Sequence, residues 1–147
     1  MAPYFNGIIA FTVSDPNVLE DDITAQIGFE PTEVVRKGKA VSSFRNAPHS
    51  VWCYKSMFED TNFNAVVLSF SQHLLSVKDN ITHALTKYEQ VEIGLYISTL
   101  YGQFGFGFAH NELSKLAELG VNVNFHFLSY GDVIKEHGRP RTNILGL

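Results

Sequence analysis

The 147-residue chain is 45% apolar, has a formal net charge of −4 and contains a single cysteine, Cys53. This length suits one domain with a hydrophobic core, and the mild acidity argues against a general nucleic-acid binder, because phosphate contacts need a basic surface. A lone cysteine forms no intramolecular disulfide, no signal-peptide pattern is visible, and no stretch reaches the roughly 18 apolar residues that span a bilayer. We therefore expect a cytoplasmic protein that binds neither membranes nor nucleic acid.

The first part of the chain predicts a strand, a helix and three shorter strands. Residues 4–13 are apolar on both alternating faces, which is typical of a central strand covered on both sides. Asp15-Pro16 predicts a helix start, and apolar residues at a four-residue spacing continue the helix to a stop at Gly28. Short strands follow at 32–36, 41–45 and 50–57, separated by turns that contain proline or glycine.

The longest periodic segment runs from Asn64 to Tyr88. Its apolar residues follow a three-four spacing that places them on one side of a helix, and Lys78-Asp79-Asn80 is the expected position of a break or kink between two helical pieces. The repeat is too short to favour a coiled coil, so we expect one long helix that packs on a sheet.

The second half of the chain predicts three strands and a short helix. Residues 91–101 alternate as a strand does, and Phe104 to Phe108 alternates phenylalanine with glycine, which predicts another strand. A helix capped by Asn111 and ended by Gly120 precedes a last strand at 121–127. In that strand His126 is expected to point away from the face that holds its two phenylalanine neighbours.

These elements predict an α+β fold. We expect a mostly antiparallel sheet with helices packed on one face, and one long, kinked helix in the middle of the chain. A single domain is expected over residues 1–131. Residues 132–147 form a C-terminal extension, either a short helix or a loose tail.

One part of the sequence resembles a known family. The segment 23–38 combines a helix stop at Gly28 with a rigid turn at Pro31, and Trp52 follows in a strand. Together with the long helix and the closing helix before the last strand, this pattern is similar to an uncharacterised bacterial family, domain of unknown function 4279, over residues 5–130. The resemblance implies a fold and carries no chemistry, because the shared residues are architectural.

No motif typical of a catalytic, metal or cofactor site is found in the sequence. The histidines lack ligand spacing, and the glycines near Phe104 lack the lysine of a phosphate-binding loop. Cys53 lies four residues from His49, about 13 Å along a strand, which is too far for proton transfer. We therefore expect no enzyme activity, no metal and no cofactor.

Two charged clusters remain as candidate binding surfaces. Negative charge early in a helix is favoured by the helix dipole alone, and a basic turn can simply keep an edge strand soluble, so each cluster also has a structural explanation. The acidic candidates for partner binding are Glu20, Asp21, Asp22, Glu59 and Asp60. The basic candidates for anion binding are Arg36, Lys37, Lys39 and Arg45.

By elimination, the sequence favours a non-enzymatic protein-binding module. Its most concrete form is an immunity or inhibitor protein that neutralises a bacterial toxin by direct binding, and a basic toxin domain would complement the acidic chain. One alternative is a small-molecule or anion-binding protein that uses the basic turn at 36–45. Another is a structural subunit that self-associates through the glycine-bearing face of Phe104 to Phe108.

Overall fold

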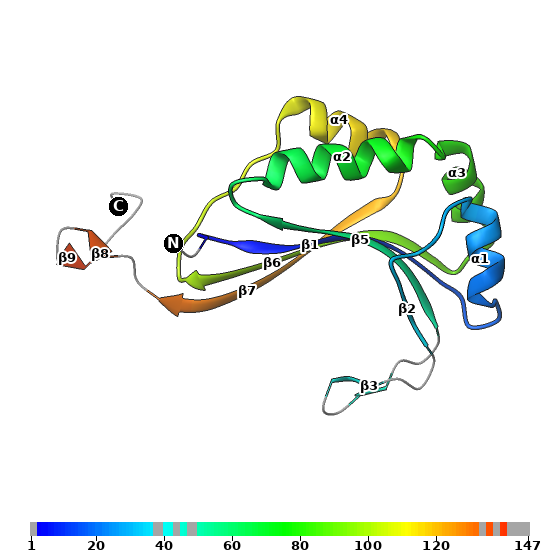
Figure 1. Ribbon diagram of the computed structural model, residues 1–147, viewed down its shortest axis with the longest axis horizontal. Coiled ribbons are helices and arrows are strands. Elements are labelled where there is room, and N and C mark those ends of the chain that lie inside the picture. The colour runs from blue at the N-terminus through cyan, green and yellow to red at the C-terminus, as the bar shows by residue number, and fades with distance from the viewer. Residues whose placement is uncertain are drawn as a thin grey trace.

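The computed structural model describes residues 3–36 and 50–132, together with the backbone of short strands at 40–42, 45–46, 135–136 and 139–140. Within these residues, Figure 1 shows one curved sheet with helices on one side of it. The main sheet contains β1 (Asn6–Ser14), β2 (Glu33–Val35), β5 (Val51–Glu59), β6 (Gln90–Tyr101) and β7 (Asn122–Asp132). The helices are α1 (Glu20–Ile27), α2 (Phe63–Leu75), α3 (Lys78–Lys87) and α4 (His110–Glu118). The two small hairpins are β3 (Ala40–Ser42) with β4 (Arg45–Asn46), and β8 (Lys135–Glu136) with β9 (Arg139–Pro140).

The sheet has the strand order β2-β5-β1-β6-β7 and is mixed. β1 pairs antiparallel with β5 and β6, and β2 pairs antiparallel with β5, whereas β7 runs parallel to β6. The predicted α+β class is confirmed, but the prediction of a mostly antiparallel sheet is wrong. The chain between β6 and β7, which contains α4, is long enough to return to the starting edge, as a parallel pair requires.

The predicted single long helix is also wrong, because the segment forms two helices, α2 and α3. The helix tightens at its end, where the N–H of Ser76 bonds to the carbonyls of Gln72 and His73, and Val77 leaves helical geometry. The break therefore precedes the kink expected at 78–80. The side-chain amide of Asn80 then donates to the carbonyl of Ile27 at 3.0 Å, which fastens α3 to the end of α1.

The first helix begins later than Asp15-Pro16 predicts. Its N-cap is Leu19, and the Asp15 carboxylate instead accepts the backbone N–H of Asn17 at 2.9 Å and that of Glu89 at 3.1 Å. Asp15 therefore holds a turn and joins it to the start of β6. The stop at Gly28 is confirmed, with a φ of 98° that glycine adopts readily.

Phe104 to Phe108 is not a strand, contrary to the prediction. It is an extended crossover between β6 and α4 whose phenylalanine rings are half-buried and whose glycines face solvent. The ring of Phe106 lies 5.5 Å from that of Phe63 on α2 and 5.9 Å from that of Phe127 on β7. The alternation of phenylalanine and glycine therefore reflects burial of one side of the segment, although the segment is not hydrogen-bonded to a neighbouring strand as part of a sheet.

The start of α4 is held by a buried carboxylate. The helix is capped at Ala109 rather than at the expected Asn111, and Glu112 accepts the backbone N–H of Ala109 at 2.9 Å. The side-chain amide of Asn64 donates to the same carboxylate at 2.8 Å and to the carbonyl of Gly107 at 2.9 Å. These bonds tie α2, the crossover and α4 together.

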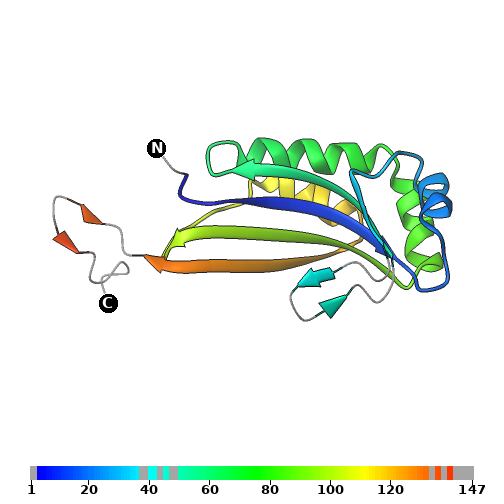
Figure 2. The ribbon, with the colours of Figure 1, turned by 60° about the horizontal axis from the view of Figure 1, so that its bottom comes forward.

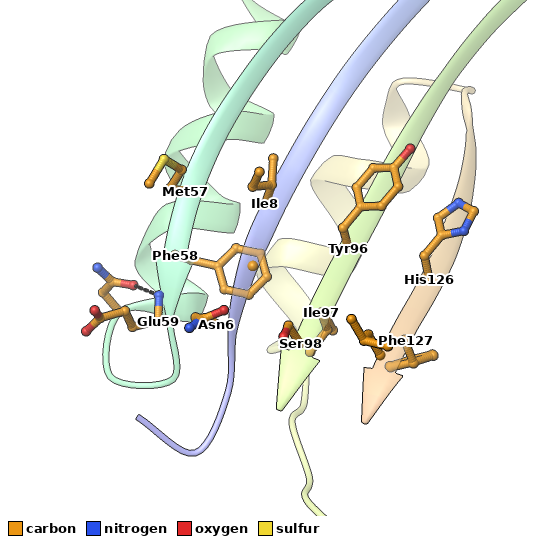
Figure 3. Close-up of a pocket in the computed structure, with 13 residues that line it drawn as sticks. Asn6, Ile8, Met57, Phe58, Glu59, Tyr96, Ile97, Ser98, His126 and Phe127 are labelled. Carbon is orange, nitrogen blue, oxygen red and sulfur yellow. Dashed lines mark hydrogen bonds between the residues drawn. The ribbon is translucent and has the colours of Figure 1, made fainter. Parts of the chain in front are cut away.

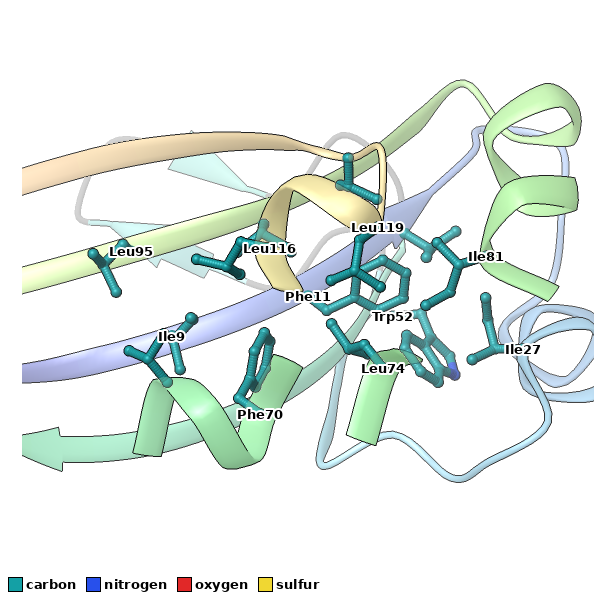
Figure 4. Packing of buried hydrophobic residues seen from close by; sticks show 14 of the residues in the cluster. Ile9, Phe11, Ile27, Trp52, Phe70, Leu74, Ile81, Leu95, Leu116 and Leu119 are labelled. Atoms are coloured by element: carbon teal, nitrogen blue, oxygen red, sulfur yellow. The ribbon is translucent and has the colours of Figure 1, made fainter. Parts of the chain in front are cut away.

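The core lies between the sheet and the helices and is rich in aromatic residues (Figure 4). Trp52 is fully buried, with ring contacts to Phe11 at 6.0 Å and Phe29 at 5.6 Å. Its indole N–H donates to the hydroxyl of Thr24 on α1 at 2.9 Å. Trp52 therefore joins β5 to α1 and fills the volume between them, with its one polar atom satisfied.

The two faces of the sheet differ in their cover. Figures 1 and 2 show α2 and α4 along one face and α1 and α3 at one end of it. On β1, Ile9, Phe11 and Val13 face this layer and are buried, whereas Ile8 faces the opposite side and is half-buried. The prediction that β1 is central is confirmed. On its second face Ala10 is buried, but Ile8 is only half-buried and no described helix covers it. None of the helices described is long and apolar enough to cross a membrane.

Candidate binding site on the open sheet face

The sheet face that no described helix covers presents its side chains in rows that cross the strands. The pairing register sets two adjacent rows, each with one residue from β5, β1, β6 and β7. The first row is Met57, Ile8, Tyr96 and His126. The second row is Glu59, Asn6, Ser98 and Leu128.

These rows line a concavity of about 780 Å³, called the sheet groove below. Figure 3 shows Met57, Ile8, Tyr96 and His126 side by side across four strands. At the end of β5, the side-chain oxygen of Asn62 accepts the backbone N–H of Glu59 at 2.8 Å (Figure 3). This bond holds the turn that places the Glu59 carboxylate at the edge of the groove.

The sheet groove exposes an unusual amount of apolar surface. Met57 is 74% exposed, Leu128 is 55% exposed and Tyr96 is 44% exposed. Single exposed apolar residues are common on proteins, but a contiguous group of them around a concavity marks an interaction site. The groove therefore offers apolar contact in its centre and polar groups at its edge.

Tyr96 is the aromatic side chain of the first row and contacts both His126 and Gly94. Its ring stacks on the imidazole of His126, with 4.6 Å between centroids and an angle of 8°. The ring also lies back along β6 over Gly94, where a Cβ atom would sit 2.6 Å from Cε2. Burial raises the pKa of the Tyr96 phenol, and the negative charge of Glu92 adds to this effect.

The other end of the open face is polar. Lys55 donates to the Glu33 carboxylate at 2.5 Å, and this bond raises the pKa of the lysine. Glu92 accepts the side-chain amide of Asn124 at 2.9 Å. Burial raises the pKa of the Cys53 thiol despite the nearby lysine, so this thiol is not activated as a nucleophile.

The predicted acidic residues do not form one patch. Glu20 forms an ion pair with Arg36 and is largely covered, while Asp21 and Asp22 are exposed on the first turn of α1. Glu59 and Asp60 lie at the opposite end of β1, roughly 25 Å away along the strand. Only Glu59 lines the sheet groove.

Only one residue of the predicted anion site has a described side chain. Arg36, its one described side chain, pairs with Glu20, so a residue predicted to bind anions and one predicted to bind a partner satisfy each other. The side chains of Lys37, Lys39 and Arg45 lie outside the described residues, as does His49. Two other carboxylates lie on the open face, Glu59 at one end and Glu92 toward the other. Neither forms an ion pair among the interactions described.

Sequence reasoning missed most of the groove. Met57, Tyr96 and Leu128 were assigned to no site, because strand alternation shows which residues share a face but not which face stays uncovered. One signal was correct: His126 lies on the face opposite to Phe125 and Phe127, as predicted. Within the described part of the chain, no group of three or more metal-ligating side chains comes together.

The comparisons with known proteins address the fold and leave the chemistry open. A family model described as "Domain of unknown function (DUF4279)" matches residues 5–130. No curated protein and no solved structure matches the chain. The match spans most of the chain and agrees with the turn residues and the tryptophan strand that suggested it, so the chain belongs to the DUF4279 family.

Proposed function

We propose that this protein is a non-enzymatic protein-binding module that holds its partner on the sheet groove. The observation that carries the proposal is the contiguous apolar surface around the groove, formed by Met57, Ile8, Tyr96 and Leu128 on a face that no described helix covers. Aromatic and methionine side chains are the residue types that anchor protein interfaces, because they bury large areas and adapt to the partner's shape.

The charges of the open face favour a basic partner. Lys55 is neutralised by Glu33, whereas Glu59 and Glu92 leave negative charge at the two ends of the apolar surface. The whole chain carries a net charge of −4. Charge of this sign speeds association with a basic protein and disfavours acidic competitors.

The most concrete form of the proposal is an immunity or inhibitor protein that neutralises a toxin by covering it. A toxin that acts on nucleic acid carries a basic surface, and such a surface complements the charges of the open face. An inhibitor needs shape and charge rather than catalytic groups. The sheet groove supplies both.

The test is binding to the product of a neighbouring toxin gene, with two matched substitutions. Met57→Glu places a charge in the centre of the groove, and Leu19→Glu places one at an equally exposed residue beside α1. Both side chains are about 70% exposed or more, so both variants should keep the wild-type stability within about 0.5 kcal/mol.

We expect Met57→Glu to weaken binding by about 30-fold or more, which corresponds to the loss of an interface hot spot, and Leu19→Glu to bind as wild type. Isothermal titration calorimetry measures both. Equal binding by the two variants would show that the groove is not the binding surface. Failure of the wild-type chain to bind the toxin or to protect against it would refute the inhibitor form of the proposal.

A further inference from the structure

β7 is a long edge strand. It pairs with β6 on one side, and within the described residues no strand pairs with its other side. The opposite edge of the sheet is β2, which is only three residues long and has Glu33 in the strand and Arg36 directly after it. Shortness and charge are the usual protections of an edge against pairing. β2 has both of them, and β7, with 11 residues, is not short.

β7 also lacks the protective residue types. From Val121 to Gly131 the sequence contains no lysine, arginine, aspartate, glutamate or proline. The residues from Asn124 to Gly131 are all exposed, and Phe125 and Phe127 are 45% and 55% exposed. Within the described residues, the edge from Val121 to Gly131 therefore combines a row of backbone groups that no strand pairs with apolar side chains and no acidic or basic residue other than His126.

We propose that two copies of this chain pair through β7, antiparallel, about a two-fold axis at His126. A two-fold axis perpendicular to the sheet keeps the helices of both copies on the same side of the joined sheet. It also requires one residue of β7 to lie opposite the same residue of the second copy. With His126 on the axis, the strand pairs over Asn122 to Tyr130 and the two sheets join into one of ten strands.

The side-chain pattern supports a second copy as the occupant and this register in particular. About this axis, a residue a given number of positions before His126 faces the residue the same number of positions after His126 in the second copy. Phe125 of each copy therefore faces Phe127 of the other. Four half-exposed rings then meet on the helix side of the sheet, where each chain already stacks these two rings in parallel. Because the paired segment from Asn122 to Tyr130 contains no lysine, arginine, aspartate or glutamate, self-pairing places none of these charges opposite each other.

The pairing is also large enough for a stable contact. Nine residues paired antiparallel form roughly eight to ten backbone hydrogen bonds, close to the about ten direct hydrogen bonds of a typical protein interface. The aromatic contacts add apolar burial beside them. This association uses the edge of β7 and not the glycines of the crossover.

Sedimentation of the full chain tests the association. We expect a species of twice the 16.5 kDa monomer mass at concentrations of about 100 μM, with the monomer recovered on dilution. A clean monomer at that concentration overturns the proposal.

Cysteine cross-linking tests the register. In the proposed pairing the two His126 Cα atoms are about 4.5–5.5 Å apart, which a disulfide spans. The matched control is Asn122, an exposed residue of the same strand and face, whose two copies are offset by roughly 26 Å. Under mild oxidation we expect His126→Cys to form a linked dimer, and Asn122→Cys and the wild type to stay unlinked.

The native thiol does not interfere, because Cys53 is buried. A dimer that links through Asn122→Cys, or that links equally through both variants, overturns the two-fold axis at His126. Circular dichroism of both variants verifies that each is folded. A folded His126→Cys variant that sediments as a dimer but does not link overturns it as well.

Discussion

Two glycines of the open sheet respond differently to the same added methyl group. An alanine Cβ at Gly7 would overlap the carbonyl oxygen of Tyr96 and lie 2.9 Å from its carbonyl carbon. At Gly94, the Cβ would lie 2.6 Å from Cε2 and 2.9 Å from the hydroxyl of the Tyr96 ring. The first obstacle is backbone of the neighbouring strand, and the second is the far end of a side chain.

The difference in cost follows from what has to move. Non-bonded carbon atoms sit about 3.5–4.0 Å apart, so Gly7→Ala requires β1 and β6 to separate by about 1 Å where they are paired. We expect Gly7→Ala to lower the free energy of unfolding by about 3 kcal/mol, at the upper end of overpacking costs. Gly94→Ala needs only a rotation of the Tyr96 ring, and we expect a change within about 1 kcal/mol. Replacing glycine by alanine also lowers the conformational entropy of the unfolded chain, and this stabilising effect is the same in both variants, so it cancels in the comparison.

Urea denaturation measures both variants, with the fluorescence of Trp52 as the probe. Trp52 is the single tryptophan and is fully buried, so its emission reports loss of the core. Coincident transitions by circular dichroism establish two-state unfolding. A cost of 3 kcal/mol corresponds to roughly 6–12 °C in Tm for a chain of this size. If Gly7→Ala costs no more than Gly94→Ala, the argument from the backbone contact is refuted.

Three further predictions concern the core and the titrating groups. Thr24→Val removes the acceptor of the Trp52 indole N–H and should cost about 1–3 kcal/mol in urea denaturation; the same cost in a Trp52→Phe background would show that this bond is not the cause. The buried Cys53 thiol, whose pKa is raised by burial, should react with a thiol reagent only as fast as the protein opens, and rapid labelling of the native protein would contradict this. Burial raises the pKa of the Tyr88 and Tyr96 phenols above the ordinary value of 10.0; the folded state then keeps protons that the unfolded chain loses, so stability is fully present below about pH 10 and falls as the pH rises further. Urea midpoints that stay constant from about pH 8 to pH 11 would contradict it.

Local features of the fold were predictable from the sequence, whereas its long-range arrangement was not. The helix stop at Gly28 and the burial of Trp52 follow from residue type and neighbouring pattern. An interruption between α2 and α3 was expected at Lys78-Asp79-Asn80, but its position at Ser76 and Val77 was not, because the apolar stripe continues in phase past Ser76. The direction of β7 relative to β6 could not be predicted from alternation, because the alternation of side chains is the same in parallel and antiparallel pairs.

The candidate site was the least predictable part. Most residues of the groove stand in strands that were predicted, although Glu59 and Leu128 lie just past the predicted ends. The site itself arises from the order of four strands and from the choice of face that the helices cover. Charge clusters attract attention in a sequence, but Glu20 and Arg36 satisfy each other in the structure. Short-range patterns therefore indicated which side chains share a face of a strand, but not where on the molecule those side chains come together.

The separation of the two sheet faces has a consequence for how this family diverges. Along β1, Ile9, Phe11 and Val13 contribute to the buried layer that maintains the fold, whereas Asn6 and Ile8 point to the other face and line the groove. Substitutions can accumulate at Ile8 or Met57 without touching the packing of Phe11 or Trp52. Under the proposed function, the residues that choose the partner are therefore separate from the residues that maintain the scaffold.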